Sequence, residues 1–307
     1  QLQPIPKEKV LGVCHFPTFY EAMESTQHIV KLDPTAVELV DRTMIDLARA
    51  IPLFAPTVNR FVQGKPDALL LVEFSGEERS EQLNKLKSLV ELMADMGFPN
   101  SVVEATDDEF QPAIWEVRKQ GLNIMMSMKG DGKPVSFIED CAVDLKDLAE
   151  YTRRLTEIFE KNGTSGTFYA HASVGTLHVR PILNMKEESG STKMRAIVEE
   201  CLEMVREYKG SHSGEHGDGI SRSEFHEPMF GKRMVKNFEE VKQAFDPGNL
   251  FNPGKIVNPH KMDDRNIMRF APGYEPIELN AKLDWSEWGG FNRAVEMCNN
   301  NGACRKA

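Results

Sequence analysis

Short apolar runs alternate with longer segments of helical period from the start of the chain to about residue 210. Short runs rich in hydrophobic and β-branched residues are typical of strands, whereas apolar residues spaced three and four apart indicate helices that bury one face. The predicted strands cover residues 10–15, 36–40, 68–74, 101–105, 135–143 and 167–181. This alternation predicts an α+β fold, in which an antiparallel sheet carries helices on one face.

Two segments have the clearest helical pattern. The first follows Ser75 and ends at Gly97, and the second ends at Gly210, where a glycine suits a left-handed cap. Their predicted buried faces are Leu83, Leu86, Val90 and Met93 in the first helix, and Met194, Ile197, Val198, Cys201, Leu202 and Val205 in the second. The main competitor is a doubly wound dinucleotide-binding fold, but no Gly-x-Gly-x-x-Gly follows a strand and opens a helix.

The charge balance argues against a nucleic-acid partner, because 37 Lys and Arg stand against 47 Asp and Glu, and no long basic run neutralises phosphates. No apolar stretch approaches the roughly 20 residues that span a bilayer, and the first residues do not resemble a signal peptide. The five cysteines, an odd number, argue against a disulfide framework. We therefore expect a folded cytoplasmic protein, at most peripheral to a membrane.

Four of the eight histidines fall between residues 171 and 216. His171 and His178 are six residues apart with Gly175 near the centre, so two antiparallel strands joined by a tight turn would bring both imidazoles to one face. Such a pair suits a divalent metal, which needs a third ligand and an open position for catalysis. A later glycine-rich loop offers Glu215 and His216, one for the metal and one for a proton. The alternative is that these histidines are structural.

Other candidate site residues lie before and after these motifs. Trp115 and Arg118 share a helix face, where the indole can hold the guanidinium and direct it at a carboxylate. The alternative is an exposed arginine beside a core tryptophan. Lys133 is a solvated turn residue unless a substrate lies above it. Asn252 lies in a run with two Pro-Gly turns, whose free amides need partners that a cofactor or the protein itself could supply.

Taken in order, these elements resemble the C-terminal half of FAD-linked oxidases of the vanillyl-alcohol oxidase / p-cresol methylhydroxylase flavoprotein family. The branch that they resemble is the D-2-hydroxyacid dehydrogenases, which includes D-lactate, glycolate and D-2-hydroxyglutarate enzymes. The motifs that carry the resemblance are Trp115-x-x-Arg118, His171-x6-His178, Gly214-Glu215-His216-Gly217 and the run from Phe245 to Lys255. The resemblance covers roughly residues 1 to 260 and implies a ferredoxin-like substrate, or cap, domain.

The resemblance also implies roles for individual residues. It assigns a zinc-like divalent metal to His171, His178 and Glu215, and the catalytic base to His216. It assigns substrate binding to Arg118 and Lys133, and the approach to the flavin to Asn252. We add Arg180 as a group that could engage a second substrate carboxylate, with a surface ion pair as the alternative. The chain departs from the usual His-x-Gly-Asp-Gly-Asn-Leu-His pattern at Ser173, Val174 and Thr176.

The implied reaction is metal-assisted oxidation of a D-2-hydroxy acid to a 2-oxo acid, with hydride transfer to FAD and electrons passed to an iron-sulfur module. Cys298 and Cys304 look like the opening of such a module, and a 4Fe-4S cluster ordinarily needs four cysteines. We therefore expect a cap domain over residues 1–260, and a linker with a truncated iron-sulfur start over 261–307. The first residue, Gln1, is not Met, which we interpret as the edge of a fragment.

This interpretation predicts that FAD is held mainly by a missing N-terminal domain, that the cluster is present in the full-length protein only, and that the fragment alone is inactive. A homo-oligomer is compatible with it. Two other classes of protein stay open at this stage. One is a flavin-independent metallohydrolase that uses the same ligands, and the other is a non-catalytic dimerisation or structural domain. The particular acid, the metal and the electron acceptor do not follow from the residues.

Overall fold

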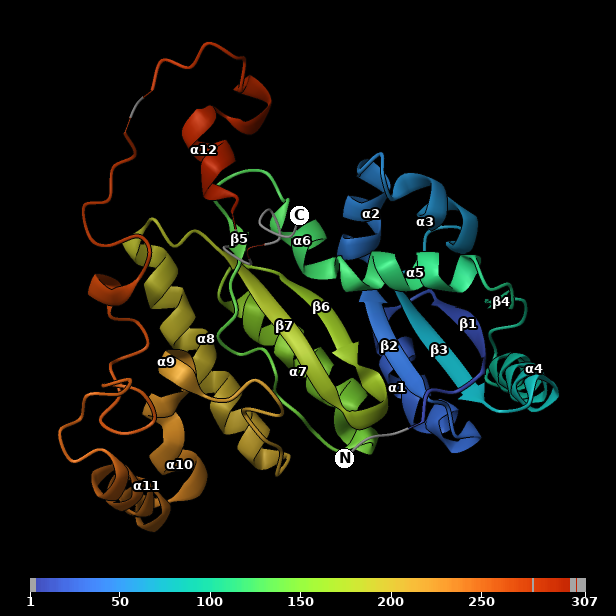
Figure 1. Ribbon diagram of the computed structural model, residues 1–307, viewed down its shortest axis with the longest axis horizontal. Helices are drawn as coiled ribbons and strands as arrows, with labels where there is room; N and C mark the ends of the chain where they lie inside the picture. Colours follow the sequence, from blue (N-terminus) through green and yellow to red (C-terminus); the bar gives the residue numbers. More distant parts are fainter. Residues whose placement is uncertain (1–3, 278, 299–301, 303–307) are drawn as a thin grey trace.

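The computed structural model describes residues 4–277, 279–298 and 302 (Figure 1). A seven-stranded sheet with the order β4-β1-β3-β2-β6-β7-β5 forms its centre, and every neighbouring pair of strands is antiparallel. The strands are β1 (Glu8–Phe16), β2 (Ala36–Asp41), β3 (Ala68–Gly76), β4 (Val102–Ala105), β5 (Lys133–Pro134), β6 (Gly166–His171) and β7 (Thr176–Leu183). The predicted α+β fold with an antiparallel sheet is confirmed.

Helices connect the strands and cover the sheet (Figure 1). The helices that precede β5 are α1 (Phe19–Ile29), α2 (Arg42–Ala50), α3 (Ala55–Phe61), α4 (Arg79–Asp95), α5 (Phe110–Lys119) and α6 (Gly121–Met126). The later ones are α7 (Leu148–Lys161), α8 (Glu188–Glu207), α9 (Gly219–Arg222), α10 (His226–Phe230), α11 (Lys232–Phe245) and α12 (Phe291–Glu296). Within the described residues, no helix has both the length and the apolar character needed to cross a membrane.

The sheet has two hydrophobic cores, one on each face. The larger core packs α1, α4, α7 and α8 against one face of the sheet. The smaller core packs α2, α3, α5 and α6 against the opposite face, over β1, β2 and β3. Successive side chains of a strand point to opposite faces, so Leu69 and Leu71 lie in the smaller core while Leu70 lies in the larger one. We expected helices on one face of the sheet. That arrangement holds only for the half built from β6 and β7, because helices cover both faces of the other half.

The strands β6 and β7 separate apolar from polar side chains. Phe168, Ala170, Leu177 and Val179 face the larger core and are buried. The alternate positions carry Tyr169, His171, His178 and Arg180, which share the other face of the sheet because side chains alternate along each strand and Tyr169 lies opposite His178. Burying one large apolar side chain contributes about 1.5–3 kcal/mol. The apolar face thus stabilises the hairpin and leaves the opposite face available for polar groups.

Two local expectations are wrong in detail. The run 135–143 is not a strand, because only Lys133 and Pro134 pair regularly with β7. After that the chain turns at Asp140, whose φ is 77°, and Ala142 makes only isolated bridges to Thr176 and Ser211. The run 167–181 is not one strand but the β6–β7 hairpin, interrupted by a 3-10 turn over Ala172–Val174.

The predicted buried stripe is right for α8 and partly wrong for α4. All six apolar residues predicted for α8 are buried. In α4 the buried residues are Gln82, Leu86, Leu89 and Met93, and Leu83 is exposed. The helix is therefore rotated relative to the predicted face. Leu86 and Leu89 pack where Gly12 of β1 has no side chain, and a Cβ there would lie 2.6 Å from Leu89.

The segment after residue 257 folds back over the domain surface (Figure 1, orange to red). Met262 is buried in the larger core. The last helix is fastened by ion pairs, since Glu296 accepts from Lys186 at 2.5 Å and Arg293 lies 3.0 Å from Asp131. The described part of this segment therefore packs against the main domain.

Candidate metal and substrate site

The β6–β7 hairpin places the two histidines of the His-x6-His motif. Its register pairs Tyr169 with His178, and His171 with Thr176. Gly175 closes the turn with φ 70°, and a Cβ at that position would lie 2.0 Å from a backbone carbonyl oxygen, so the turn requires glycine. Since side chains alternate along a strand, His171 and His178 point to the same face, as the spacing predicts.

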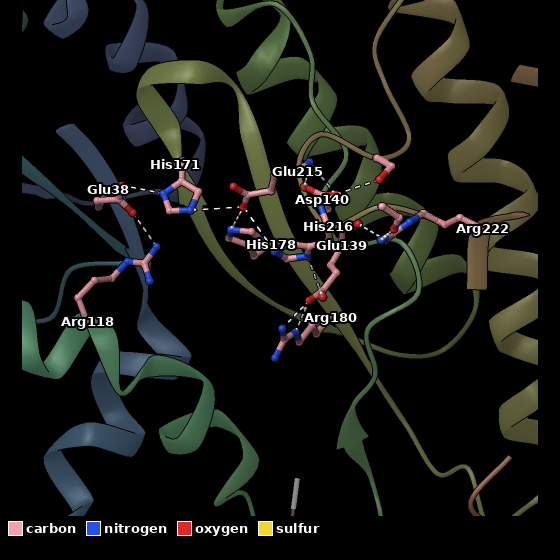
Figure 2. Close-up of polar contacts among 12 residues, drawn as sticks. Glu38, Arg118, Glu139, Asp140, His171, His178, Arg180, Glu215, His216 and Arg222 are labelled. Carbon is pink, nitrogen blue, oxygen red and sulfur yellow. Dashed lines mark hydrogen bonds and ion pairs between the residues drawn. The ribbon is translucent and has the colours of Figure 1, made fainter. Parts of the chain in front are cut away.

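The predicted metal ligands converge on that face (Figure 2). Oε1 of Glu215 lies 3.1 Å from Nε2 of His178 and 3.5 Å from Nε2 of His171. One ligand atom from each of the three residues lies within 4.8 Å of the others. Two imidazoles and a carboxylate are the donors that zinc-like ions take in catalytic sites, with a further position left open. The donor set therefore fits a divalent metal.

The loop that carries Glu215 and His216 is held by a buried aspartate. The carboxylate of Asp140, which is fully buried, accepts from the backbone N–H of Glu215 at 2.9 Å and of His216 at 2.8 Å, and from Oγ of Ser213 at 3.2 Å. The guanidinium of Arg222 donates to the carbonyl of Gly217 at 2.6 Å. These contacts, and not the histidine hairpin, fix where the loop presents its side chains.

His216 is oriented between two carboxylates. Its Nδ1 lies 3.3 Å from Oε1 of Glu139, and its Nε2 lies 3.4 Å from Oε1 of Glu215. Its ring stacks on His178, with centroids 5.0 Å apart. Glu139 also accepts from Nε of Arg180 at 2.6 Å. Glu139, His178 and His216 have ligand atoms close enough to form a second possible donor set, which shares His178 with the first.

Glu38 joins the metal-ligand hairpin to the predicted substrate arginine. It lies directly opposite His171 in the β2–β6 pairing. Its carboxylate contacts Nδ1 of His171 at 2.8 Å and accepts from Nη2 of Arg118 at 2.6 Å. Nε of Arg118 is buried and, within the described ranges, has no hydrogen-bond partner. The guanidinium lies over the ring of Tyr169, 4.9 Å from its centroid, while Trp115 donates to Glu73. The expectation that Trp115 holds Arg118 is therefore wrong.

The surroundings give the two hairpin histidines different protonation properties. The hydrogen bond to Glu38 raises the pKa of His171. Burial, followed by the neighbouring His171 and His216, lowers the pKa of His178 to about 3. His178 is therefore neutral at ordinary pH, which leaves a ring nitrogen free to bind a metal. A carboxylate on the distal nitrogen of a ligand histidine, as Glu38 provides for His171, is a common support for metal binding.

Three acidic residues of this site were missed by sequence reasoning, namely Glu38, Glu139 and Asp140. Each of them interrupts an otherwise apolar run, Glu38 between Val37 and Leu39, and the other two within residues 135–143. A charged residue inside an apolar run is rarely buried without a partner. The charged residues within apolar runs therefore indicate buried, paired carboxylates, although the sequence does not identify their partners.

The remaining predicted residues lie outside the cluster. Lys133 is opposite Leu183, and its Nζ donates to the carbonyl of Met128. It lines a separate cavity of about 350 Å³ whose walls are largely apolar. Asn252 lies in the exposed loop after α11 and accepts from Lys255 at 3.4 Å. Cys298 is exposed after α12, and Cys304 lies outside the described residues.

Comparison with known proteins places the chain in a family. A family model described as FAD linked oxidases, C-terminal domain, matches residues 5–256. A D-2-hydroxyglutarate dehydrogenase of Pseudomonas putida is 29% identical over 98% of the chain and 30% of its own length. One of Escherichia coli K12 is also 29% identical, with the same coverage. The glycolate oxidase subunit GlcD of Bacillus subtilis is 25% identical over 81% of the chain and 51% of its own length. The chain thus spans less than a third of the two dehydrogenases.

Solved structures show the same fold at low sequence identity. A substrate-bound p-cresol methylhydroxylase matches 83% of the chain and 54% of its own chain, with a TM-score of 0.62 at 14% identity. The 4-ethylphenol oxidase of Gulosibacter chungangensis matches 84% of the chain and 55% of its own chain, with a TM-score of 0.58 at 13% identity. The family match covers most of the chain, and the chain belongs to the family of FAD-linked oxidase C-terminal domains.

Proposed function

We propose that this chain is the substrate-binding part of a flavin-dependent dehydrogenase that oxidises a D-2-hydroxy acid to a 2-oxo acid. The observation that carries the proposal is the convergence of His171 and His178 on Glu215, with His216 and Arg118 on the same face of the sheet. The similarity to D-2-hydroxyglutarate dehydrogenases and to a glycolate oxidase subunit supports the substrate class.

A divalent cation is held by His171, His178 and Glu215 in this proposal. Such a cation, when bound, supplies Lewis acidity that favours loss of the proton from the substrate hydroxyl. The protein residues do the rest of the positioning. Glu38 holds the ring of His171 by its Nδ1, and Asp140 holds the backbone of Glu215. The ring of His171 and the backbone at Glu215 are therefore held in place before a cation arrives.

His216 accepts the proton of the substrate hydroxyl. Both ring nitrogens face a carboxylate, Glu139 at Nδ1 and Glu215 at Nε2. With Glu215 committed to a cation, Glu139 holds the ring proton on Nδ1 and leaves Nε2 unprotonated. A base that is held in this tautomer is ready to accept a proton at Nε2. A positioned general base typically contributes about 10²- to 10⁴-fold to the rate.

Arginines on both sides of the cluster bind the acid groups. Arg118 donates to the carboxylate next to the reacting carbon, because its Nε is buried without a partner among the described residues and can take a substrate oxygen. Arg180, which also lies by the ring of Tyr169 and is paired with Glu139, binds the second carboxylate of a dicarboxylic acid. Lys133 is a weaker candidate for substrate binding than the two arginines, because its Nζ already donates to a backbone carbonyl.

The chain acts together with parts of a longer flavoprotein. FAD, which accepts the two electrons of the oxidation, is held mainly by another domain, and Asn252 approaches it. Cys298 and Cys304 are the first cysteines of an iron-sulfur module that receives the electrons, and two cysteines are too few for a cluster. We expect the 307-residue chain alone to lack iron and acid-labile sulfide, and stoichiometric amounts of both would contradict this assignment.

The test is turnover of the full-length protein with an artificial electron acceptor. We expect D-2-hydroxy acids to reduce the acceptor and their L-enantiomers not to, with loss of turnover after chelation and recovery on adding Zn²⁺. His178→Gln should remove metal and turnover together, and His216→Asn should lower kcat while metal content stays. His28→Asn is the matched control, because His28 lies in α1 on the opposite face of the sheet. Flavin-independent ester hydrolysis, or full turnover of His178→Gln, would refute the proposal.

A further inference from the structure

A second cluster of metal-binding side chains lies beside the loop of the first site. His212 precedes the loop, Asp218 follows it at the start of α9, and His226 is the first residue of α10. Their ligand atoms, one from each residue, lie within 4.8 Å of one another. His212 and His226 are only 4% and 2% exposed. The cluster shares no residue with the donor sets that contain His178.

The polar atoms of this cluster face a common point. Nε2 of His226 lies 2.7 Å from Oδ2 of Asp218, and Nε2 of His212 lies 3.3 Å from Oδ1 of the same carboxylate. Nε2 of His212 and Oδ1 of Asp218 are nevertheless buried without a hydrogen bond to each other or to any other described group. Buried polar atoms are rarely left unpartnered. Two such atoms at this separation indicate a missing shared partner.

The spacing fits a small divalent cation. Zinc bound at about 2.0–2.1 Å from each of four ligands sets neighbouring ligand atoms about 3.3 Å apart. The 3.3 Å separation of His212 and Asp218 matches that value, and the 2.7 Å separation of His226 and Asp218 is shorter by the length expected of a direct hydrogen bond. A simple hydrogen-bonded pair explains only the contact between His226 and Asp218. That pair does not explain why Nε2 of His212 and Oδ1 of Asp218 are buried next to each other without a hydrogen bond.

Aromatic rings and one arginine flank the cluster. The rings of Phe230 and Phe238 pack against His226 at centroid distances of 5.5 and 5.7 Å. Nη1 and Nη2 of Arg222 donate to backbone carbonyls, while its Nε is buried without a hydrogen-bond partner among the described residues.

We propose that His212, Asp218 and His226 form a second, structural site for a zinc-like divalent cation. Its ligands bracket the loop from both ends, because Glu215 and His216 lie between His212 and Asp218 in the sequence. The third ligand ties the loop to α10. The site thus fixes the ends of the segment whose centre supplies a ligand and the base of the first site.

The test is the Zn²⁺ stoichiometry of the metal-stripped 307-residue chain, measured by calorimetric titration and by elemental analysis after dialysis. We expect two equivalents for the unmodified chain and one each for His226→Gln and Asp218→Asn. Co²⁺ substitution should give visible absorption that falls by about half in both variants. Circular dichroism confirms folding, and Asp218→Asn decides the question if His226→Gln does not fold, because it preserves the shape of the side chain.

The two metal sites can be distinguished in the same experiment. His178→Gln removes the first site and should leave one equivalent, which then disappears in the double variant with Asp218→Asn. Two equivalents in folded Asp218→Asn would overturn the second site. So would a single equivalent in the unmodified chain that is lost in His178→Gln. If instead His178→Gln keeps two equivalents while Asp218→Asn keeps one, the first site fails and the second stands.

Discussion

Asp140 is the residue whose replacement tests the site most directly without touching a proposed ligand. Its carboxylate is fully buried and is the shared acceptor for the backbone N–H groups of Glu215 and His216. We consider Asp140→Asn, which keeps the shape of the side chain. One of its two oxygens becomes an amino group, so a loop N–H that now meets an acceptor would meet a donor instead.

The magnitude follows from the contacts that are lost. Glu215 N–H lies 2.9 and 3.0 Å from the two carboxylate oxygens, and His216 N–H lies 2.8 Å from one of them. An asparagine whose oxygen takes the Oδ2 position still accepts from both groups, but its NH₂ then faces the N–H of Glu215 where Oδ1 accepted at 2.9 Å. A hydrogen bond to a charged acceptor contributes about 1.5–3 kcal/mol. The variant should lose about that much unfolding free energy. The part of this loss that displaces Glu215 also weakens Zn²⁺ binding, by at most roughly 150-fold at about 1.4 kcal/mol for each factor of ten.

The assay combines chemical denaturation of the metal-free chain with Zn²⁺ titration. Asp144→Asn is the control, since Asp144 lies four residues further along the same segment but is exposed, and we expect little change in either measurement. If Asp140→Asn is destabilised yet binds Zn²⁺ as tightly as the unmodified chain, the loop position does not determine metal affinity. That result would refute the argument from Asp140 to the metal site.

Three other changes test the turn, the buried core and the substrate arginine. Gly175→Ala should cost more unfolding free energy than Gly64→Ala. Both residues have positive φ, which costs about 1–2 kcal/mol for alanine. Only at Gly175 would the Cβ also lie 2.0 Å from the carbonyl oxygen of Val143. Equal losses of unfolding free energy in chemical denaturation would contradict this. Burial raises the pKa of Asp41 from 3.8 to about 6. The folded state therefore favours the protonated form, and stability falls as the pH rises from 4 to 7, by up to about 3 kcal/mol relative to Asp41→Asn; a constant difference across that range would argue against it. Arg118→Lys in the full-length enzyme should raise KM for the acid about tenfold or more, because lysine lacks the planar fork; steady-state kinetics with an unchanged KM would remove Arg118 from substrate binding.

Local patterns in the sequence predict much of this fold because they reflect local physics. The apolar spacing of α8 identifies its buried face fully, since one helix packed on one sheet leaves little choice. The spacing of His171, Gly175 and His178 predicts a hairpin with both imidazoles on one face, which the structure confirms. Alternation along a strand also makes the open face of β6 and β7 predictable.

The features that the sequence does not predict depend on contacts between distant parts of the chain. Glu38 meets His171 only because β2 lies beside β6 in the sheet, although many other elements separate them in the sequence. Asp140 holds the loop at Glu215 because residues 135–143 leave the regular strand pairing. Neither partnership follows from spacing. The rotation of α4 has the same origin, since the small Gly12 decides which of its leucines can approach β1.

The alternation along β6 and β7 also bears on how this domain can change its preference among acids. Phe168 and Val179 point into the larger core, whereas Tyr169, Arg180 and Ile182 point to the face that carries the site. Substitutions at the second group alter what surrounds a substrate and leave the packing that supports the hairpin intact. A directed-evolution library confined to Tyr169 and Ile182 would therefore vary selectivity while the buried Arg180 keeps its ion pair with Glu139.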